Sequence, residues 1–424
     1  MGIFNALFAG VNGINSNGNA IAVVGDNISN VNTTGFKASA AAFEDILAGA
    51  DSNVGLGSRI SDVVSQFSQG GFESTSNVTD MAIDGNGFFV VKSPADASTF
   101  YSRNGQFHLD KDGYVTNTDG LRLQGFQVDD TNNITASVGD IQINQEPVSP
   151  NPTADVELNI NLNSNSAAPG AFSTTDPTNT SNFSAGVTVY DSLGNSHLLS
   201  IYFRKSSTNT WSWYALANGP EVTGATASTY YQGGTGTMTF TTSGGLQSVT
   251  TTSSYFSFIG AGVSQAISFD FGTFAGASSG GALDGVTQFG SSSAITNITQ
   301  DGYASGSLKN IDISTEGIVT GNYTNGTNQQ LGQIVLATFN NQNGLSRTGS
   351  SNYRETLESG LATLSAPQTT GKGSIVSSTL EQSNVDLANE LIKMVIIQRG
   401  FQANTRTIGT INDMLAQLVT LGQG

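Results

Sequence analysis

The sequence predicts an α+β protein, mostly β, in which paired N- and C-terminal α-helices of coiled-coil type accompany two nested β-rich domains. Apolar residues near both ends recur at alternate steps of three and four, which is the period of an amphipathic helix. Between the ends the apolar period falls to two, which indicates strands. Sequence rich in Pro, Asn, Ser and Thr over 147–185 marks a change of domain within the β region. The order helix, β, different β, β, helix predicts that the outermost domain is inserted in the other.

The composition excludes several kinds of site before any motif is considered. The 424 residues carry a net charge of −17, so a basic surface for nucleic acid is missing and an anionic membrane would repel the chain. The absence of Cys excludes disulfides and thiolate sites, and two His residues are too few for a multi-histidine zinc site. No apolar run reaches the ~18 residues of a membrane span, and no basic segment precedes an apolar run near residue 1. We expect no nucleic-acid partner, membrane insertion, cofactor, metal or standard secretory signal.

Residues 1–30 are predicted to form an amphipathic helix that cannot stand alone. Interior glycines, at Gly10, Gly13, Gly18 and Gly25, each cost about 0.8–1 kcal/mol relative to alanine. Its apolar side chains contribute at most about 9–18 kcal/mol, whereas ordering the backbone costs about 1–2 kcal/mol per residue. We therefore expect this helix to order against the C-terminal helix and further copies of the chain. The expected interface residues are Ile3, Leu7, Ile14, Ile21, Val24 and Ile28.

A second amphipathic helix is predicted over about 384–420. Ser383 followed by Asp386 resembles a capping box at its start. Antiparallel packing of the two helices would bring the ends of the chain together. The expected interface residues on this helix are Leu387, Leu391, Met394, Val395, Phe401, Ile408, Ile411, Leu415 and Leu418.

The β region contains several hairpin signals. Residues 81–83 and 88–91 flank the turn sequence 84–87, which predicts two strands joined by a hairpin turn. Residues 103–107 and 112–114 repeat this turn chemistry, a further hairpin is predicted over 187–203, and compact hairpin signals return over 302–339. These observations predict a terminal helical polymerisation domain at 1–30 and 380–424, connecting segments at 31–75 and 365–379, an inner β domain at 76–147 and 300–364, and an inserted outer β domain at 148–299.

No motif in the chain predicts catalysis. Residues 276–280 match the G-x-S-x-G pattern of a nucleophile elbow, but they lie in Gly/Ser-rich sequence. A hydrolase of that type also needs a later His, whereas His108 and His197 both precede the motif. A flexible loop is the expected structure.

Two other groups of residues have ordinary structural interpretations. Asp110, Asp112 and Asp119 loosely resemble a calcium loop, but the glycine position is wrong and no glutamate closes it, so a turn is expected. Trp211 and Trp213 alternate along one predicted strand and could form a sugar platform. Aromatic residues on one face of a strand more often fill a core.

Both ends of the chain resemble the signatures of bacterial flagellar rod and hook proteins. The C-terminal signature lies at 383–387 and 398–404, and the interior segments 187–195, 301–303 and 332–337 resemble the hook members of this family. A rod protein would be shorter and would lack a domain like 148–299. The N-terminal signature, residues 24–37, includes Asn27, Ile28, Asn30, Gly35, Phe36 and Lys37.

This resemblance implies a non-enzymatic subunit of the flagellar hook, which self-assembles into a flexible helical tube outside the cell. The tube would act as a universal joint that transmits motor torque from rod to filament. The resemblance also implies export by the flagellar type III apparatus and contacts with the hook cap, distal rod and hook–filament junction proteins. A distal rod protein is the alternative within the family. A secreted β-rich adhesin or carbohydrate-binding module is the alternative outside it.

Overall fold

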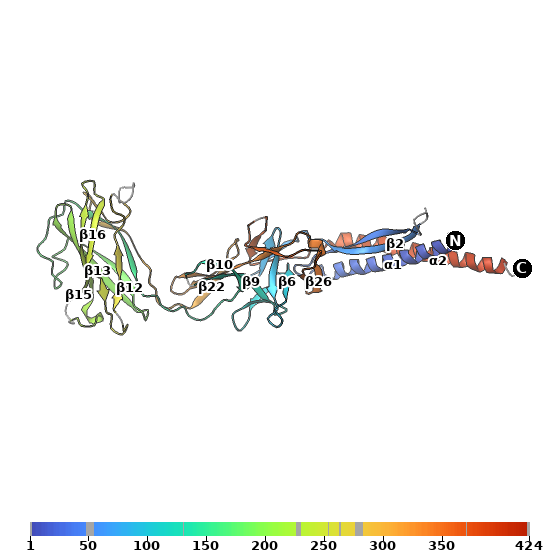
Figure 1. Ribbon diagram of the computed structural model, residues 1–424, viewed down its shortest axis with the longest axis horizontal. Helices are drawn as coiled ribbons and strands as arrows, with labels where there is room; N and C mark the ends of the chain where they lie inside the picture. Colours follow the sequence, from blue (N-terminus) through green and yellow to red (C-terminus); the bar gives the residue numbers. More distant parts are fainter. Residues whose placement is uncertain are drawn as a thin grey trace. The chain divides into compact units, whose positions relative to one another are not determined.

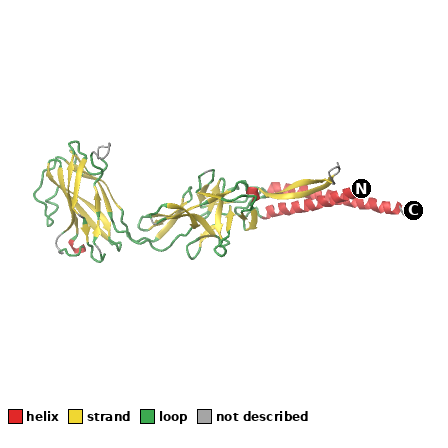
Figure 2. Cartoon of the chain, viewed as in Figure 1, coloured by secondary structure: helices red, strands yellow, loops and turns green. Residues whose placement is uncertain are grey.

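The protein forms two compact units, each described separately in this computed structural model (Figure 1). Unit 1 contains 1–145, 310–322 and 328–424, and unit 2 contains 146–309 and 323–327. The structure is mostly strand with one long helix near each end of the chain (Figure 2), so the predicted fold class is confirmed. A finer division of unit 1 stays a prediction. The structure describes residues 2–47, 55–129, 131–225, 230–252, 254–262, 264–275, 283–369 and 371–421, apart from the side chains of 2, 3, 252, 418, 420 and 421.

Two long helices, α1 (Gly2–Ser29) and α2 (Leu387–Leu421), form one end of unit 1. The start of α2 corrects the predicted capping box. Asp386 Oδ1 accepts hydrogen bonds from the backbone N–H groups of Ala388 and Asn389, at 2.9 and 3.2 Å. Ser383 Oγ instead accepts from Val385 N in the preceding turn. The helix begins three residues later than expected because Asp386, not Ser383, satisfies its free N–H groups.

A long antiparallel hairpin of β1 (Ser39–Leu47) and β2 (Gly55–Ser65) packs along α1. Asn12 Nδ2 of the helix donates to Leu56 O at 2.8 Å. Gly57, at φ +95°, has its backbone so close to Ala9 that an added Cβ would lie 2.8 Å from Ala9 O. The sequence predicts only a connecting segment over 31–75, and these strands escape prediction because β1 is rich in alanine, which is uncommon in strands.

The rest of unit 1 is built around a sheet whose strands come from both halves of the chain. Phe88, Val90, Tyr101, Val335 and Tyr353 belong to its core. The remaining strands of this unit are β3 (Phe72–Ser74), β4 (Met81–Asp84), β5 (Phe88–Lys92), β6 (Thr99–Ser102), β7 (Phe107–Leu109), β8 (Val115–Asn117), β9 (Arg122–Val128), β10 (Ile134–Asp140), β22 (Leu308–Ile313), β23 (Ile318–Tyr323), β24 (Asn328–Ile334), β25 (Leu336–Thr338), β26 (Ser346–Gly349), β27 (Asn352–Arg354), β28 (Thr363–Ser365), β29 (Ser374–Ser377) and β30 (Thr379–Glu381), with a short 3-10 helix η2 (Gln342–Gly344). The outer ends of β22 and β23 extend into unit 2. The path of the sheet is β22-β23-β24-β9-β5-β6-β27-β26, with further strands paired beside it.

The hairpin predicted around 84–87 is wrong, although both of its strands exist. β5 pairs with β6 along one edge and with β9 and β25 along the other, so neither edge is free for β4. β4 pairs instead with β29, with Ile83 opposite Ile375. The turn therefore carries the chain from one sheet to another.

Other predicted hairpins have mixed outcomes. Residues 103–107 connect β6 to β7, which do not pair with each other in the described sheets. The turn at 110–113 does join the paired strands β7 and β8. The hairpins of β12 (Phe183–Tyr190) with β13 (Ser196–Ser207) and of β23 with β24 are confirmed, with Tyr190 opposite Ser196 and Asn322 opposite Asn328.

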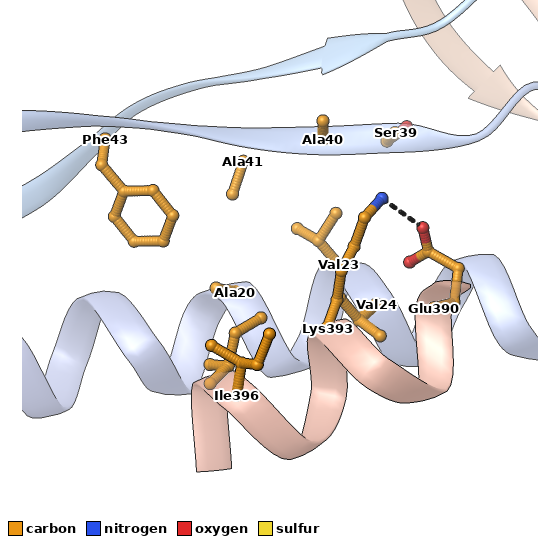
Figure 3. Close-up of a pocket in the computed structure, with 11 residues that line it drawn as sticks. Ala20, Val23, Val24, Ser39, Ala40, Ala41, Phe43, Glu390, Lys393 and Ile396 are labelled. Carbon is orange, nitrogen blue, oxygen red and sulfur yellow. Dashed lines mark hydrogen bonds and ion pairs between the residues drawn. The ribbon is translucent and has the colours of Figure 1, made fainter. Parts of the chain in front are cut away.

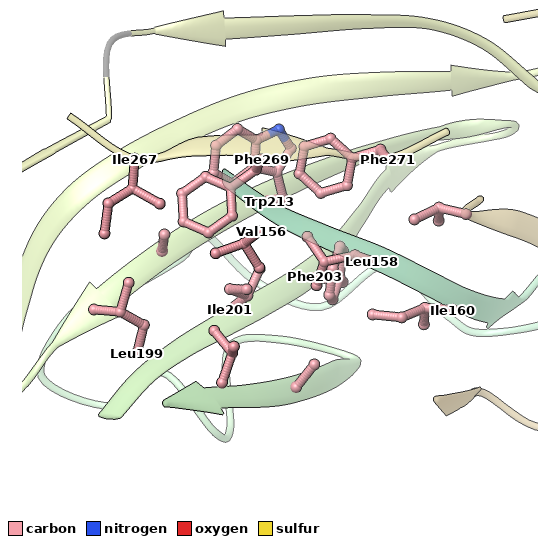
Figure 4. Close-up of a cluster of buried hydrophobic side chains, with 14 of the residues drawn as sticks. Val156, Leu158, Ile160, Leu199, Ile201, Phe203, Trp213, Ile267, Phe269 and Phe271 are labelled. Carbon is pink, nitrogen blue, oxygen red and sulfur yellow. The ribbon is translucent and has the colours of Figure 1, made fainter. Parts of the chain in front are cut away.

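Among the described residues, unit 2 has three sheets around one apolar core. The five-stranded antiparallel sheet β12-β13-β14-β15-β16 contributes Phe203 and Trp213, and the sheet containing β11 and β19 contributes Leu158 and Phe269 (Figure 4). Trp211 belongs to the same core, and β17 and β18 form a third, two-stranded sheet. This arrangement is a β-sandwich. Its elements are β11 (Asp155–Asn163), β12 (Phe183–Tyr190), β13 (Ser196–Ser207), β14 (Thr210–Ala217), η1 (Gly219–Glu221), β15 (Tyr231–Phe240), β16 (Leu246–Thr252), β17 (Tyr255–Phe256), β18 (Gln265–Ala266), β19 (Ser268–Asp270), β20 (Thr287–Phe289) and β21 (Ala294–Gln300).

Candidate functional site: the terminal helix pair and its buried junction

The helices α1 and α2 pack antiparallel, and glycines lie where they approach most closely. A Cβ on Gly10 would come within 2.9 Å of Ile408 Cγ1, and one on Gly400 would lie 3.2 Å from Asn17 Oδ1. A Cβ on Gly13 would overlap the side chain of Asn404. From the sequence, the α1 glycines are expected only to weaken the helix. In the structure, Gly10 and Gly13 allow the two backbones to approach.

The structure separates the predicted interface residues into a packed and an uncovered set. On α1, Val24 is buried, and Leu7, Ile14, Ile21 and Ile28 are half-buried. On α2, Ile411 is buried, Met394, Ile408 and Leu415 are half-buried, and Leu387, Leu391, Val395 and Phe401 are exposed. The side chains of Ile3 and Leu418 lie outside the described residues.

Helix α2 therefore presents an apolar face that the rest of the described chain leaves exposed. Leu391 and Val395 are each 47% exposed. Their neighbours Ile392 and Ile396, which the sequence analysis did not select, are 58% and 63% exposed. Phe8 on α1 is 56% exposed, so large apolar side chains reach solvent from both helices. Contiguous apolar surface of this kind marks an interaction site.

The base of the helix pair is held by the motif residue Asn27. Its side chain makes a reciprocal pair with Ser39 at the start of β1: Asn27 Nδ2 donates to Ser39 O at 2.8 Å, and Ser39 N donates to Asn27 Oδ1 at 2.9 Å. Asn27 Nδ2 also lies 3.1 Å from Glu390 Oε2 on α2, and Glu390 Oε1 forms an ion pair with Lys393 Nζ at 2.6 Å. One buried amide thus joins α1, the hairpin and α2.

The remaining motif residues lie beyond the end of α1. Asn30 Nδ2 donates to Asp26 Oδ1, and the backbone of Gly35 adopts φ +67°. A Cβ on Gly35 would be 2.6 Å from the carbonyl carbon of Arg103, so this position requires glycine for both its conformation and its space. Phe36 is buried, with the guanidinium of Arg347 5.1 Å from its ring centre.

Lys37 belongs to a buried ionic junction of three side chains. Lys37 Nζ lies 2.7 Å from Glu381 Oε1, and Arg103 Nη1 lies 3.4 Å from Glu381 Oε2. The exposed fractions of these side chains are 0% for Lys37 and Glu381 and 2% for Arg103. Burial lowers the pKa of Lys37, while the charge of Glu381 and their hydrogen bond act in the opposite direction. Two cations thus share one carboxylate, which the sequence analysis did not select.

Backbone groups bind most of the polar atoms of this junction, and Arg103 Nε is buried without a hydrogen-bond partner among the described residues. Lys37 Nζ donates to Ser68 O at 2.7 Å, Gly70 N donates to Glu381 Oε1 at 2.9 Å, and Arg103 Nη2 donates to Gly85 O at 2.8 Å. These bonds orient the charged groups in a site from which water is excluded. The junction therefore fixes the connection between the helical end and the sheet within unit 1.

The other sequence candidates have structural roles where they are described. Asp110 Oδ1 accepts from the backbone of Asp112 and Tyr114 in a tight turn. Trp211 and Trp213 are each 0% exposed in the core of unit 2, so they do not form a surface platform for sugars. The G-x-S-x-G residues 276–280 lie outside the described residues. Among the residues that the structure describes, no group of three acidic or histidine side chains is placed to hold a metal.

Comparison with known proteins identifies the family. The flagellar hook protein of Salmonella typhimurium is 35% identical over 424 aligned residues, which cover 97% of this chain and 98% of that protein. The chain belongs to the flagellar hook protein family. Hook proteins of Treponema pallidum and Borreliella burgdorferi are 33% and 31% identical, each over 99% of this chain. The crystal structure of the Helicobacter pylori flagellar hook protein FlgE2 has a similar fold, with a TM-score of 0.54, 14% identity and coverage of 73% of this chain and 100% of that one.

Four family models match successive parts of this hook protein. They are the flagella basal body rod protein at residues 7–37, the flagellar hook protein FlgE/F/G D1 domain at 82–163, the flagellar basal body protein FlaE D2 domain at 161–303 and the flagellar basal body rod FlgEFG protein C-terminal model at 376–421. The first covers α1 from residue 7 onward, and the last covers the whole of α2. The family is structural, and its place is the bacterial flagellar hook. As far as the structure describes α1 and α2, neither helix is long and apolar enough to cross a membrane.

Proposed function

We propose that this hook protein polymerises through the apolar faces of α1 and α2 into the inner wall of a flexible helical tube. The observation that carries the proposal is the uncovered face of α2, where Leu391, Ile392, Val395 and Ile396 are exposed in a single chain. Leu391 and Val395 are one turn apart, as are Ile392 and Ile396, so the four side chains share one side of the helix. Burying them against further copies removes apolar area from water, which is the main favourable contribution to association.

The family resemblance supports a fuller role for this tube. The chain is exported unfolded by the flagellar type III apparatus, and the tube lies outside the cell as a universal joint that transmits torque from rod to filament. Its partners are copies of itself, the hook cap, the distal rod and the hook–filament junction proteins. No enzymatic step is part of this role. The burial of Trp211 and Trp213 removes the observation that favoured a carbohydrate-binding module.

Assembly of the purified protein tests the proposal. Wild-type protein should form sedimentable tubes that are visible by negative-stain electron microscopy. Leu391→Asp should abolish them while unit 2 stays folded, because a charge in an apolar interface is strongly unfavourable. Gln402→Asp is the matched control, since it adds the same charge to the same helix at an exposed polar position. Normal tubes from Leu391→Asp, or no tubes from wild-type protein, would overturn the proposal.

A further inference from the structure

Two leucines on one loop of unit 1 are more exposed than any other large apolar side chain that the structure describes. Leu357 is 103% exposed and Leu361 is 83% exposed, whereas the next, Ile396, reaches 63%. Both lie in the leucine loop, defined as residues 355–362, between β27 and β28. The loop also carries Glu358, whose side chain is exposed.

Hydrogen bonds at the centre of the leucine loop support a conformation that leaves these side chains in solvent. Ser359, between the two leucines, is 0% exposed, and its Oγ accepts a hydrogen bond from Thr356 N at 2.9 Å. Thr356 Oγ1 donates to Gly344 O at 2.6 Å, and Asn341 Nδ2 donates to Glu358 O at 3.2 Å. Gly360, at φ +72°, completes the turn. A loop fixed at its centre cannot turn its leucines inward, so it is pre-organised to present them to a partner.

A groove elsewhere in unit 1 has the chemistry to receive such a side chain. The helix–hairpin groove lies between α1, α2 and β1 and has a volume of about 240 Å³. Figure 3 shows small residues, including Ala20 and Ala41, in this groove, together with Phe43 and Ile396. Further lining residues are Val23, Val24, Ser39, Ala40, Glu390, Lys393 and Ile397.

The groove is continuous with the exposed face of α2, because Ile396 belongs to both. Lys393 at the groove is 50% exposed although it is paired with Glu390, so it can also meet the exposed carboxylate of Glu358 beside the leucines of the loop. Because loop and groove are different surfaces of the same chain, their contact would be head-to-tail. Contacts of this type generate open helical assemblies when the rotation does not close.

We propose that the leucine loop of one copy docks in the helix–hairpin groove of a second copy, with Leu361 against Ala41 and Glu358 near Lys393. This inference rests on the proposed function, because it requires that the chain polymerise. It adds a contact that neither helix makes by itself. Neighbouring copies are then held both by their helices and by this loop.

Cysteine cross-linking tests this contact, because the wild-type chain contains no Cys. The double variant Leu361→Cys, Ala41→Cys is assembled, oxidised and separated on a non-reducing denaturing gel. A ladder of covalent oligomers is expected, since each chain contributes one loop and one groove. Each single variant should give no ladder. Tubes of the double variant without a ladder would overturn the inference.

A second variant keeps the test decisive if the cysteines disturb assembly. Leu357→Asn, Leu361→Asn should raise the protein concentration needed for assembly at least tenfold, with the melting of both units unchanged. The control Leu193→Asn removes a leucine that is 60% exposed in unit 2 and should leave that concentration unchanged. An unchanged concentration for the loop variant would sink the inference while the proposed function stands. Absence of tubes from wild-type protein would remove both.

Discussion

The buried junction of Lys37, Arg103 and Glu381 predicts two substitutions with unequal costs. In the folded protein two cations share one carboxylate. Glu381→Gln leaves both cations buried without a counter-charge, which should cost about 3–5 kcal/mol in the free energy of unfolding. Lys37→Met leaves Glu381 paired with Arg103 at 3.4 Å and still bonded to the N–H of Gly70 at 2.9 Å. Its cost should be about 1–3 kcal/mol, the cost of the hydrogen-bond partners that it leaves unsatisfied.

The position of the tryptophans makes this prediction measurable within one sample. Both Trp residues of the chain, Trp211 and Trp213, are buried in unit 2. Tryptophan fluorescence in urea therefore follows unit 2, and far-UV circular dichroism follows both units. We expect Glu381→Gln to lower the urea midpoint of unit 1, seen by circular dichroism, and to leave the unit 2 transition seen by tryptophan fluorescence unchanged.

An exposed ion pair supplies the matched control. Glu44→Gln makes the same chemical change in the pair with Arg59, whose side chain is 68% exposed, and should cost at most about 1 kcal/mol. If Glu381→Gln is no less stable than Lys37→Met, then the charge argument is wrong. If it is no less stable than Glu44→Gln, then the junction contributes little to unit 1.

Three further predictions concern the ends, the inserted unit and pH. In a confirmed monomer, the backbone amide hydrogens of residues 3–28 should exchange rapidly with solvent, because α1 has four interior glycines and only part of its face is covered. Protection of these amides from exchange would contradict the prediction. Replacing residues 149–305 with a short Gly/Ser linker should leave a cooperative melting transition for unit 1. The linker can be short because Val148 N donates to Gly306 O at 2.8 Å, so the two cut ends are close. Loss of the transition would show that the units fold together. Burial lowers the pKa of Lys372 from its ordinary value of 10.5 to about 8, so between these values the unfolded chain binds more protons and stability should rise with pH. From pH 7 to 9.5 the unfolding free energy, relative to that of Lys372→Met, should increase by at most about 2 kcal/mol, because solvent screening reduces the full value; a decrease would contradict the sign.

Elements that depend on local sequence patterns were predicted correctly, whereas strand pairings between distant segments were not. The bounds of α1 follow from a sustained apolar repeat. The hairpin in which Tyr190 lies opposite Ser196 follows from its turn residues. Both can be predicted from local sequence. The pairing of β4 is not visible, because it depends on β25 and β9 having already filled the edge of β5. Turn residues reveal where a chain bends, but they do not reveal which strand it will meet.

The motif residues illustrate the same limit at the candidate site. Asn27 and Lys37 were identified by resemblance to the family signature, but the local sequence does not indicate what they contact. Their partners Glu390 and Glu381 lie 363 and 344 residues further along the chain. Glu381 belongs to no periodic pattern that would predict its burial. An isolated glutamate usually lies at the surface, so its buried position is not expected from the sequence.

These same separations constrain when the base of the helix pair can order. Asn27 needs Glu390, Lys37 needs Glu381, and Ala38 N donates to Asn384 Oδ1 at 2.7 Å across 346 residues. A chain without its last segment has none of these partners, so a buried Lys37 would face no counter-charge, which is strongly unfavourable. The helix α1, already weakened by its glycines, therefore acquires its anchor only when residues 381–390 are present. The anchor at the base of α1 is thereby coupled to the presence of the C-terminal segment, whereas the rest of α1 still depends on further copies for the burial that it lacks.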